Sequence, residues 1–351
     1  MSIYDKMLKD GESLVRDEIP LDYDYIPHKV PFRENEQEEI AHALRPLTTG
    51  RSGKNLFIYG PPGVGKTFVI KHLFREIGFE TNNIQPLYIN CWKKDTSHRI
   101  ALEICKQIGY KWTHNKGTDE LLKSILEILN KRSTVICLDE VDKTKDLDIL
   151  YNLCEDLNNK TIILVTNYAD WIGDLDDRIK SRLIPGVLEF KPYDANSTRG
   201  ILKERKNFAF VPGVWEENAF DLVVEKTWQL KDIRTGLFLL KESSDVAEIN
   251  ASRKITLEHT KKAISKFSDN FKIKDSGEFG EDEQQIIEII KSNSGKTIKE
   301  LYKIYTENEG DKSYRTFYRK IDELLENHMV ELGEKEGKSR IIIYSKKLNE
   351  F

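Results

Sequence analysis

The sequence predicts an α/β core with a parallel sheet flanked by helices, followed by an all-α domain and a C-terminal winged-helix domain. Between residues 55 and 190, short apolar runs alternate with longer segments of helical period, which is typical of βαβ units. From residue 196 to 271 the strand-like runs disappear, and apolar residues recur three and four positions apart. After residue 282, three helical segments precede two short β-like pieces, an order typical of a winged helix.

The composition is that of a folded intracellular protein. Of the 351 residues, 39% are hydrophobic and 32% are charged, which excludes a disordered chain, a collagen-like chain and a disulfide scaffold. Lysine and arginine number 55 against 59 acidic residues, a net charge of −4, so any nucleic-acid binding must come from local patches. The first residues lack the apolar core of a signal peptide, and the longest apolar runs are too short to span a membrane. We therefore expect a cytoplasmic protein that binds no membrane.

The four cysteines have neither a CxxC pair nor the spacing of a zinc site. They are Cys91, Cys105, Cys137 and Cys154. We expect reduced, mostly buried thiols, as in other cytosolic proteins.

The predicted core domain, residues 1–195, starts with a polar segment and an amphipathic helix from Glu34 to Leu44. Its strands are predicted at residues 56–60, 86–90, 134–140, 161–167 and 187–190. These runs are apolar throughout rather than alternating, so both faces of the sheet should be covered by helices.

The all-α domain is predicted over residues 196–272 and the winged helix over residues 283–351. Between them, residues 273–282 contain two glycines and several charges, which predicts a linker. The winged-helix elements are expected to be helices at residues 283–292, 297–307 and 313–327, followed by a hairpin.

Residues 60–67 read Gly-Pro-Pro-Gly-Val-Gly-Lys-Thr and match the phosphate-binding pattern GxxxxGK[ST] between a predicted strand and a predicted helix. The glycines allow backbone N–H groups to turn toward phosphate oxygens at a helix N-terminus. Lys66 should neutralise the β- and γ-phosphates, and the Thr67 hydroxyl should ligate Mg²⁺. ATP or ADP with Mg²⁺ are the expected cofactors. The predicted nucleotide-binding residues of this loop are Pro62, Gly63, Val64, Gly65, Lys66, Thr67 and Phe68.

Two later strands of the predicted sheet end in polar side chains. The run 134–140 ends in Asp139 and Glu140, at the sheet edge where ligands bind. Asp139 should hold Mg²⁺ through water, and Glu140 should polarise the attacking water. Asn167 ends the run 161–167 and could hydrogen-bond the γ-phosphate or that water. For Asp142, a third acid nearby, a surface or interface role is expected.

Residues 281–351, which include the predicted winged helix, carry 13 basic and 15 acidic residues, a balance of −2, but the two kinds of charge are separated along the third helix. Basic residues gather at the start of the third helix and acidic ones lie further along, and a recognition helix enters the major groove by its N-terminal residues. A protein-binding winged helix with a solvated charged face is the alternative. The predicted DNA contacts are Lys312, Ser313, Tyr314, Arg315, Arg319 and Lys320 on the helix, and Lys335, Lys338 and Arg340 on the wing.

The chain as a whole resembles the AAA+ superfamily and, within it, the archaeal and eukaryotic origin-recognition and cell-division-control initiator family. The segments that carry this resemblance are residues 30–44, 87–109, 138–143, 175–183, 188–210, 231–250 and 255–263, in family order. The Asn-Cys segment at residues 90–91, the Tyr193 junction and the lid helix are the specific ones. Residue Lys231 departs from the family pattern, in which glycine is usual.

The resemblance implies roles for residues outside the phosphate loop. Arg234 resembles the lid arginine that reaches the γ-phosphate, and Tyr193 and Arg205 match junction residues near the nucleotide. Phe32 and Arg33 are implied to sit near the adenine.

A trans-acting arginine finger is also implied. Arg182 resembles it, with Arg178 as the competing residue, and either would serve the nucleotide of a neighbouring initiator subunit. The initiator-specific helix, residues 95–109, with the following residues 110–112, is implied to touch DNA as well.

These features predict a replication initiator that binds double-stranded origin DNA and helps load the replicative helicase. Slow ATP hydrolysis would act as the switch, so the protein would be a weak ATPase in the cytoplasm at the nucleoid. One alternative is a nucleotide-gated DNA-binding regulator that acts in transcription. Another is a clamp-loader-like or signalling ATPase whose winged helix binds protein.

Overall fold

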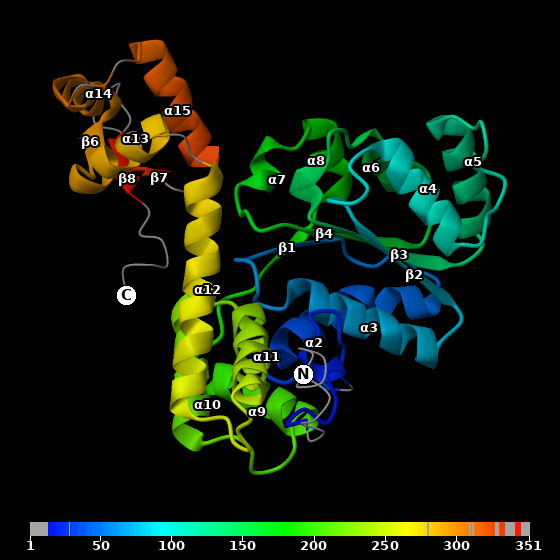
Figure 1. The fold of residues 1–351 in the computed structure, drawn as a ribbon. Helices are drawn as coiled ribbons and strands as arrows, with labels where there is room; N and C mark the ends of the chain where they lie inside the picture. Colours follow the sequence, from blue (N-terminus) through cyan, green and yellow to red (C-terminus); the bar gives the residue numbers. More distant parts are fainter. Residues whose placement is uncertain are drawn as a thin grey trace. The chain divides into compact units, whose positions relative to one another are not determined.

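The computed structural model describes residues 13–27, 29–278, 281–308, 310, 312–326, 330–333 and 341–344. The chain divides into two compact units, Met1–Thr260 and Lys261–Phe351. The first unit contains a sheet domain and a helical domain, and each unit has its own apolar core (Figure 1). No helix among these described residues is both long and apolar enough to cross a membrane.

The sheet domain is built on five parallel strands, as predicted. They are β1 (Leu56–Tyr59), β2 (Ile84–Asn90), β3 (Ser133–Asp139), β4 (Lys160–Val165) and β5 (Gly186–Glu189). Their order across the sheet is β2-β3-β4-β1-β5, so β4 lies between β3 and β1. The carboxyl ends of these three central strands therefore lie side by side at one edge of the sheet.

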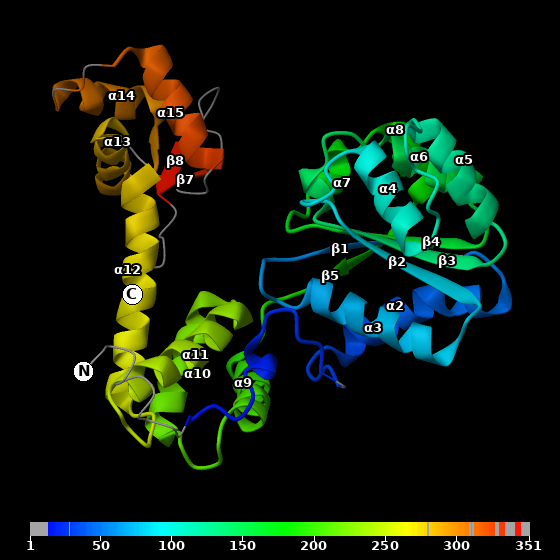
Figure 2. The same ribbon diagram turned by 45° about the vertical axis from the view of Figure 1, so that its right-hand side comes forward.

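Both faces of this sheet are buried along its central strands β1, β3 and β4, which explains their apolar runs. Every residue of β3 is buried, and alternate residues face opposite sides. Val135 and Cys137 pack with α2 (Glu34–Leu44) and α3 (Lys66–Glu80). Ile136 and Leu138 pack with the helices on the other face, which Figures 1 and 2 show together. Those helices are α4 (Ser97–Gln107), α5 (Thr118–Leu129), α6 (Asp148–Asp156), α7 (Trp171–Asp174) and α8 (Asp177–Leu183).

Short 3₁₀ helices occur at Ile19–Leu21 (η1), Arg45–Thr49 (η2) and Val141–Lys143 (η3). The four cysteines are buried free thiols, as expected.

The helical domain follows the sheet without further strands in its described residues. It consists of α9 (Ala195–Ala209), α10 (Glu217–Leu230), α11 (Ile233–Ile249) and the start of α12 (Leu257–Glu278). The three central helices pack closely at Gly236 of α11, where an added Cβ would lie 2.6 Å from Thr227 Oγ1 and 2.7 Å from Leu202 Cδ2. An all-α domain was the prediction for this region, and it is confirmed.

The segment expected to be a linker is helical over residues 273–278, where α12 continues. Extending an existing helix costs much less than nucleating one, and no proline interrupts this stretch. The division between the compact units falls at Thr260 and Lys261, earlier than the boundary placed by composition.

The second unit contains α13 (Glu281–Ser292), α14 (Ile298–Glu307) and α15 (Tyr314–Glu326). A small antiparallel sheet of order β6-β8-β7 accompanies them, from β6 (Lys296–Thr297), β8 (Ile341–Tyr344) and β7 (Val330–Leu332). Its core joins apolar residues of all three helices and of two strands, including Ile290, Leu301, Phe317 and Ile342. The wing residues predicted to contact DNA, Lys335, Lys338 and Arg340, lie outside the described residues.

Candidate nucleotide-binding site

The polar ends of the three central strands meet in one site. The loop after β1 holds the glycine-rich sequence, β3 ends at Asp139, and Asn167 follows β4. Because β4 separates β1 from β3, these groups come together through sheet order alone.

The glycines of the loop adopt backbone angles that other residues rarely reach. Gly60, Gly63 and Gly65 have φ values of +150°, +76° and +92°. An added Cβ on Gly65 would lie 2.9 Å from the Tyr193 hydroxyl oxygen, and one on Gly63 would lie 2.0 Å from Asp232 Oδ1. The loop therefore curls tightly at the N-terminus of α3 with neighbours packed against its glycines, as a phosphate cradle requires.

Lys66 lies at the centre of the site and is 7% exposed. Its Nζ donates to the carbonyl oxygens of Gly60 at 2.6 Å and Pro61 at 2.9 Å, and to Asn167 Oδ1 at 2.7 Å. Burial lowers the pKa of Lys66 to about 8, against the opposing effect of Asp139. Among the described residues no carboxylate reaches ion-pair distance of this ammonium group, so the site fits a further anion such as phosphate.

Thr67, Asp139 and Tyr88 form a hydrogen-bonded group beside Lys66. The Thr67 hydroxyl donates to Asp139 Oδ2 at 2.6 Å, and the Tyr88 hydroxyl donates to the same oxygen at 2.7 Å. Burial, followed by the nearby Asp139 charge, raises the pKa of Tyr88, so this phenol stays a donor. Hydroxyl and carboxylate oxygens suit Mg²⁺. The described residues contain no cluster of three or more His, Cys, Asp or Glu that could hold a metal, so a cation here would need phosphate oxygens and water as further ligands.

Glu140 follows directly in a left-handed conformation with φ +55°, which ends the strand, and it lines the same cavity as the glycine-rich loop. Asn90 Nδ2 at the end of β2 donates to Glu140 Oε2 at 3.3 Å.

Asp142 is not a surface residue, contrary to the expectation. Its side chain is 6% exposed, accepts a hydrogen bond from Thr166 Oγ1 at 2.7 Å, and pairs with Lys143 at 2.9 Å. The Thr166 contact therefore links η3, which contains Asp142, to the residue that follows β4.

A cavity of about 350 Å³ opens beside these groups. The glycine-rich loop, Asp139, Glu140 and Asn167 line one part of it, and Tyr193, Arg205 and Arg234 also line it. Arg234 lies in the first turn of α11, about half exposed, and its guanidinium pairs with the helix-capping Asp232 through Nε at 3.1 Å and Nη2 at 2.9 Å. Six residues predicted from family resemblance or from the motifs thus line the same cavity as the phosphate loop.

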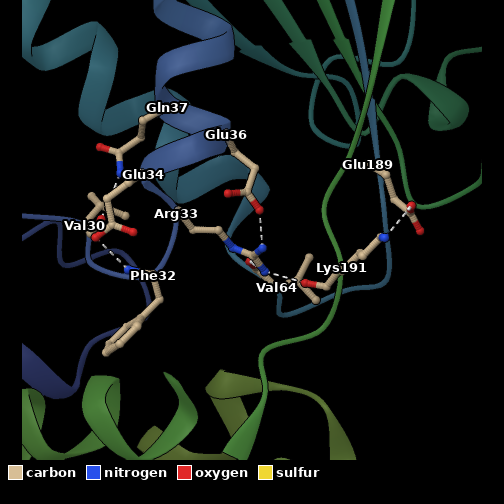
Figure 3. Close-up of polar contacts among 9 residues, drawn as sticks. All are labelled: Val30, Phe32, Arg33, Glu34, Glu36, Gln37, Val64, Glu189 and Lys191. Carbon is tan, nitrogen blue, oxygen red and sulfur yellow. Dashed lines mark hydrogen bonds and ion pairs between the residues drawn. The ribbon is translucent and has the colours of Figure 1, made fainter. Parts of the chain in front are cut away.

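Arg33 and Phe32 do not line this cavity. Arg33 is 5% exposed, its guanidinium stacks 4.0 Å from the Tyr193 ring centre, and it donates to the carbonyl oxygens of Val64 and Lys191. An ion pair to Glu36 completes its contacts (Figure 3). Arg33 therefore braces the back of the phosphate loop.

Phe32 has φ +65° and is 41% exposed. An added Cβ on Gly200 would lie 2.4 Å from Phe32 Cζ, so the ring rests on α9 at a position that only glycine leaves open.

Arg205 is 8% exposed and donates to the carbonyl oxygens of Pro20 at 3.2 Å and Tyr25 at 3.4 Å. Burial lowers the pKa of this guanidinium. Arg205 thus both borders the cavity and binds the N-terminal segment.

The two candidate arginine fingers lie on α8, away from the cavity of their own chain. Arg178 is 79% exposed and pairs with Asp176 at 2.9 Å, and Arg182 is 47% exposed and pairs with Glu155 at 2.5 Å. The structure therefore leaves both available to a second subunit.

Sequence reasoning missed Tyr88 and Asp232. Tyr88 contacts Asp139 only because β2 lies beside β3, and the order of strands in the sheet is not readable from the strand pattern. For Asp232 a signal existed, since an Asp two residues before Arg234 at a helix start is a typical N-cap.

The fold and the site define a nucleotide-binding AAA+ protein with a helical lid, and comparisons with known proteins agree. Residues 49–167 match the family model of the AAA domain, and residues 199–265 match that of the Cdc6 AAA+ ATPase-type lid domain. The ORC1-type DNA replication protein 1 of Archaeoglobus fulgidus is 31% identical over 292 residues, which cover 78% of this chain and 70% of that protein. The chain belongs to the family of ORC1-type DNA replication proteins.

Two further similarities support this assignment. The ORC1-type DNA replication protein 1 of Sulfurisphaera tokodaii is 34% identical over 258 residues, which cover 68% of this chain and 64% of that protein. The Aeropyrum pernix ORC1 protein, solved in complex with DNA, superposes with a TM-score of 0.71 at 25% identity, covering 95% of this chain and 94% of that one. The family predicted from the sequence is confirmed, and so are the AAA+ core and the lid.

Proposed function

We propose that this protein is a replication initiator that binds ATP or ADP with Mg²⁺ in the cavity and binds double-stranded origin DNA through its C-terminal unit. The observation that carries the proposal is the buried Lys66 ammonium beside the Thr67–Asp139 pair, in a chain of the ORC1-type family. Bound ATP would supply the γ-phosphoryl group, whose hydrolysis distinguishes the two states of the switch.

The residues of the site divide the work by their chemistry. Lys66 would hold phosphate oxygens, and Thr67 with Asp139 would hold the metal ion. Glu140 would orient a water molecule and accept its proton, while Asn167, hydrogen-bonded to Lys66, would donate through its amide nitrogen.

The lid would report the nucleotide state through Arg234. Two nitrogens of its guanidinium donate to Asp232 at the cavity wall, and two oxygens of a phosphate would accept the same pair of hydrogen bonds. Slow hydrolysis would then change how α11 sits on the phosphate loop, which it touches through the Ile233 N–H to Gly63 carbonyl contact at 3.4 Å.

Nucleotide binding and hydrolysis can be separated by two variants. We expect Lys66→Ala to lose ATP binding, and Glu140→Gln to bind ATP normally but to lower turnover by at least about a hundredfold, the lower range for a general base. Filter binding and phosphate release measure both, with Glu127→Gln on the exposed side of α5 as control. Equal turnover by all variants and the parent protein would overturn the assignment.

We further propose that the C-terminal unit is a winged-helix DNA-binding domain. Its antiparallel sheet and three helices support this, and α15 has two distinct faces. Phe317 and Ile321 are buried in the core, whereas Arg315 and Arg319 are exposed on the outer face with Tyr314. Arg315 and Arg319 therefore lie on the exposed face of the first turns of α15, where a recognition helix would contact a major groove.

Binding to duplex DNA tests this second proposal. The double variant Arg315→Ala/Arg319→Ala should weaken binding to a labelled chromosomal origin fragment and lower the salt slope by about two charges. Lys299→Ala on the exposed side of α14 serves as the control. Fluorescence anisotropy at several salt concentrations measures both quantities. Preference for promoters would favour a transcriptional regulator, and no affinity at low salt would favour a protein-binding winged helix.

The wider cellular role follows from the same proposal. The protein would act in the cytoplasm at the nucleoid, would help load the replicative helicase, and would meet other initiator subunits through α8. Arg182 or Arg178 would then reach a neighbouring nucleotide, and ATP turnover that rises with protein concentration would identify this contact. Loss of that rise in Arg182→Ala alone would select Arg182 over Arg178.

A further inference from the structure

Two arginines from different domains hold neighbouring carbonyl groups of the N-terminal segment. Arg205, on α9 of the lid, donates to Pro20 O at 3.2 Å and to Tyr25 O at 3.4 Å. Arg75, on α3 of the sheet domain, donates through Nη1 to Ile26 O at 2.9 Å and through Nη2 to Pro27 O at 2.7 Å. The chain thus passes from one domain to the other between Tyr25 and Ile26.

The flanking contacts show the same division. Before residue 20, the segment is bound to the lid: Val15 bridges to Phe210, and Glu18 pairs with Lys241 at 3.2 Å. Contacts to α3 begin at Asp24, which pairs with Lys71 at 3.3 Å, and Tyr25 is the last residue of the segment that Arg205 holds. Figure 2 shows this segment, in blue, running between α9 and the helices of the sheet domain. We call residues 20–27 the strap.

The strap also forms part of the cavity wall. Tyr23, Asp24, Ile26 and Pro27 line the cavity, which the lid completes with Ile201 and Leu237. The strap and the lid thus supply apolar lining residues, whereas Lys66, Asp139 and Asn167 supply polar ones. A planar base needs such an apolar slot, and its shape depends on where the strap is held.

Both guanidinium groups donate hydrogen bonds to the strap rather than pairing with an acidic side chain. Among the described residues neither Arg75 nor Arg205 has a carboxylate within ion-pair distance, and both donate to carbonyl oxygens. Arg205 also lies 4.8 Å from the Tyr25 ring centre. Holding a loop in its bound conformation before a ligand arrives raises affinity, because less ordering is left to be done on binding.

We propose that Arg75 and Arg205 are positioning residues that hold the strap between the two domains, so that the base slot is formed before the nucleotide binds. Binding of a base in this slot would then change the contacts between the strap and the lid. This inference rests on the proposed nucleotide binding. According to this inference, a bound base would affect the lid through the strap. This effect would be separate from the contact between Arg234 and a phosphate group. Neither arginine takes part in the chemistry of hydrolysis.

The variant Arg75→Gln tests the clamp. We expect the Kd values of ATP and ADP to rise together about tenfold, which corresponds to about 1.4 kcal/mol, with kcat at saturating ATP within twofold of the parent. The nucleotide-dependent protection of α9 and α11 in hydrogen exchange should fall, while protection of the phosphate loop persists. Arg132→Gln is the matched control, since the side chain of that exposed arginine donates to the Gln85 side chain at 3.1 Å, outside the strap and the cavity.

A second variant covers the case in which Arg75→Gln fails to fold. Arg205→Lys keeps the buried cation but not the two-pronged donor, and it should raise both Kd values in the same way. In the double variant Arg75→Gln/Arg205→Lys the effects should be less than additive, because either change alone releases the same strap. Fully additive effects, or unchanged Kd values in both single variants, would overturn the clamp. If the parent protein itself binds no nucleotide, the proposed function fails instead.

Discussion

Single side chains set the electrostatics of the nucleotide site. Lys66 is a buried cation whose partners are two carbonyl oxygens and an amide oxygen. Carbonyl dipoles compensate such a charge only in part, which is why its pKa falls to about 8 through burial. Without nucleotide, the buried Lys66 ammonium group is therefore only partly compensated, and a bound phosphate would stabilise its charge.

The stability of the nucleotide-free protein should depend on pH through this residue. The folded-state pKa of about 8 lies below the usual 10.5, so between these values the unfolded chain binds more protons, and stability rises with pH. A shift of this size corresponds to about 3 kcal/mol at most. Urea denaturation from pH 7.5 to 10 measures the effect as the difference between the parent protein and Lys66→Met. A difference that stays flat over this range would contradict it.

The phosphate loop, Asp139, Glu140 and Asn167 were predictable because each follows a recognisable apolar strand. Tyr88 was not, since its contact to Asp139 depends on strand order, which no local pattern encodes. Arg33 and Phe32 were expected near the adenine; Arg33 contacts the phosphate loop and Phe32 lies on α9, and their proximity to a bound base stays a prediction. Those places depend on how the N-terminal segment crosses the molecule, a tertiary feature.

Helix packing in the lid limits what sequence changes α11 accepts. Alanine is normally the better helix former than glycine by about 1 kcal/mol. At Gly236, however, an added Cβ would lie 2.6 Å from Thr227 Oγ1, so the neighbouring helices would have to move. At Gly78, near the end of α3, no atom lies within 4 Å of such a Cβ.

The two substitutions should therefore have opposite signs. We expect Gly236→Ala to lower the free energy of unfolding by about 1–3 kcal/mol and Gly78→Ala to raise it by about 0.5–1 kcal/mol. Chemical denaturation of both variants in parallel measures the pair. A gain of stability in Gly236→Ala would show that α11 does not pack on α9 and α10 as closely as described.

At the scale of elements, the sequence pattern located the strands and helices but misplaced one boundary. The charged segment at residues 273–282 has the composition of a linker, yet α12 continues to Glu278. Composition reports whether a segment can bury apolar surface, whereas helix continuation depends on the helix already formed upstream. The two compact units of this chain accordingly divide between Thr260 and Lys261, within α12, rather than in a loop.

The whole molecule consists of two compact units with separate cores, and only the first contains the nucleotide cavity. Calorimetry should therefore resolve two unfolding transitions. ATP at a hundred times its Kd should stabilise the unit that binds it by about 2.7 kcal/mol and leave the other transition unchanged. In Lys66→Ala neither transition should respond to ATP. Equal shifts of both transitions in the parent protein would contradict this, because the nucleotide would then stabilise the second unit as much as the first.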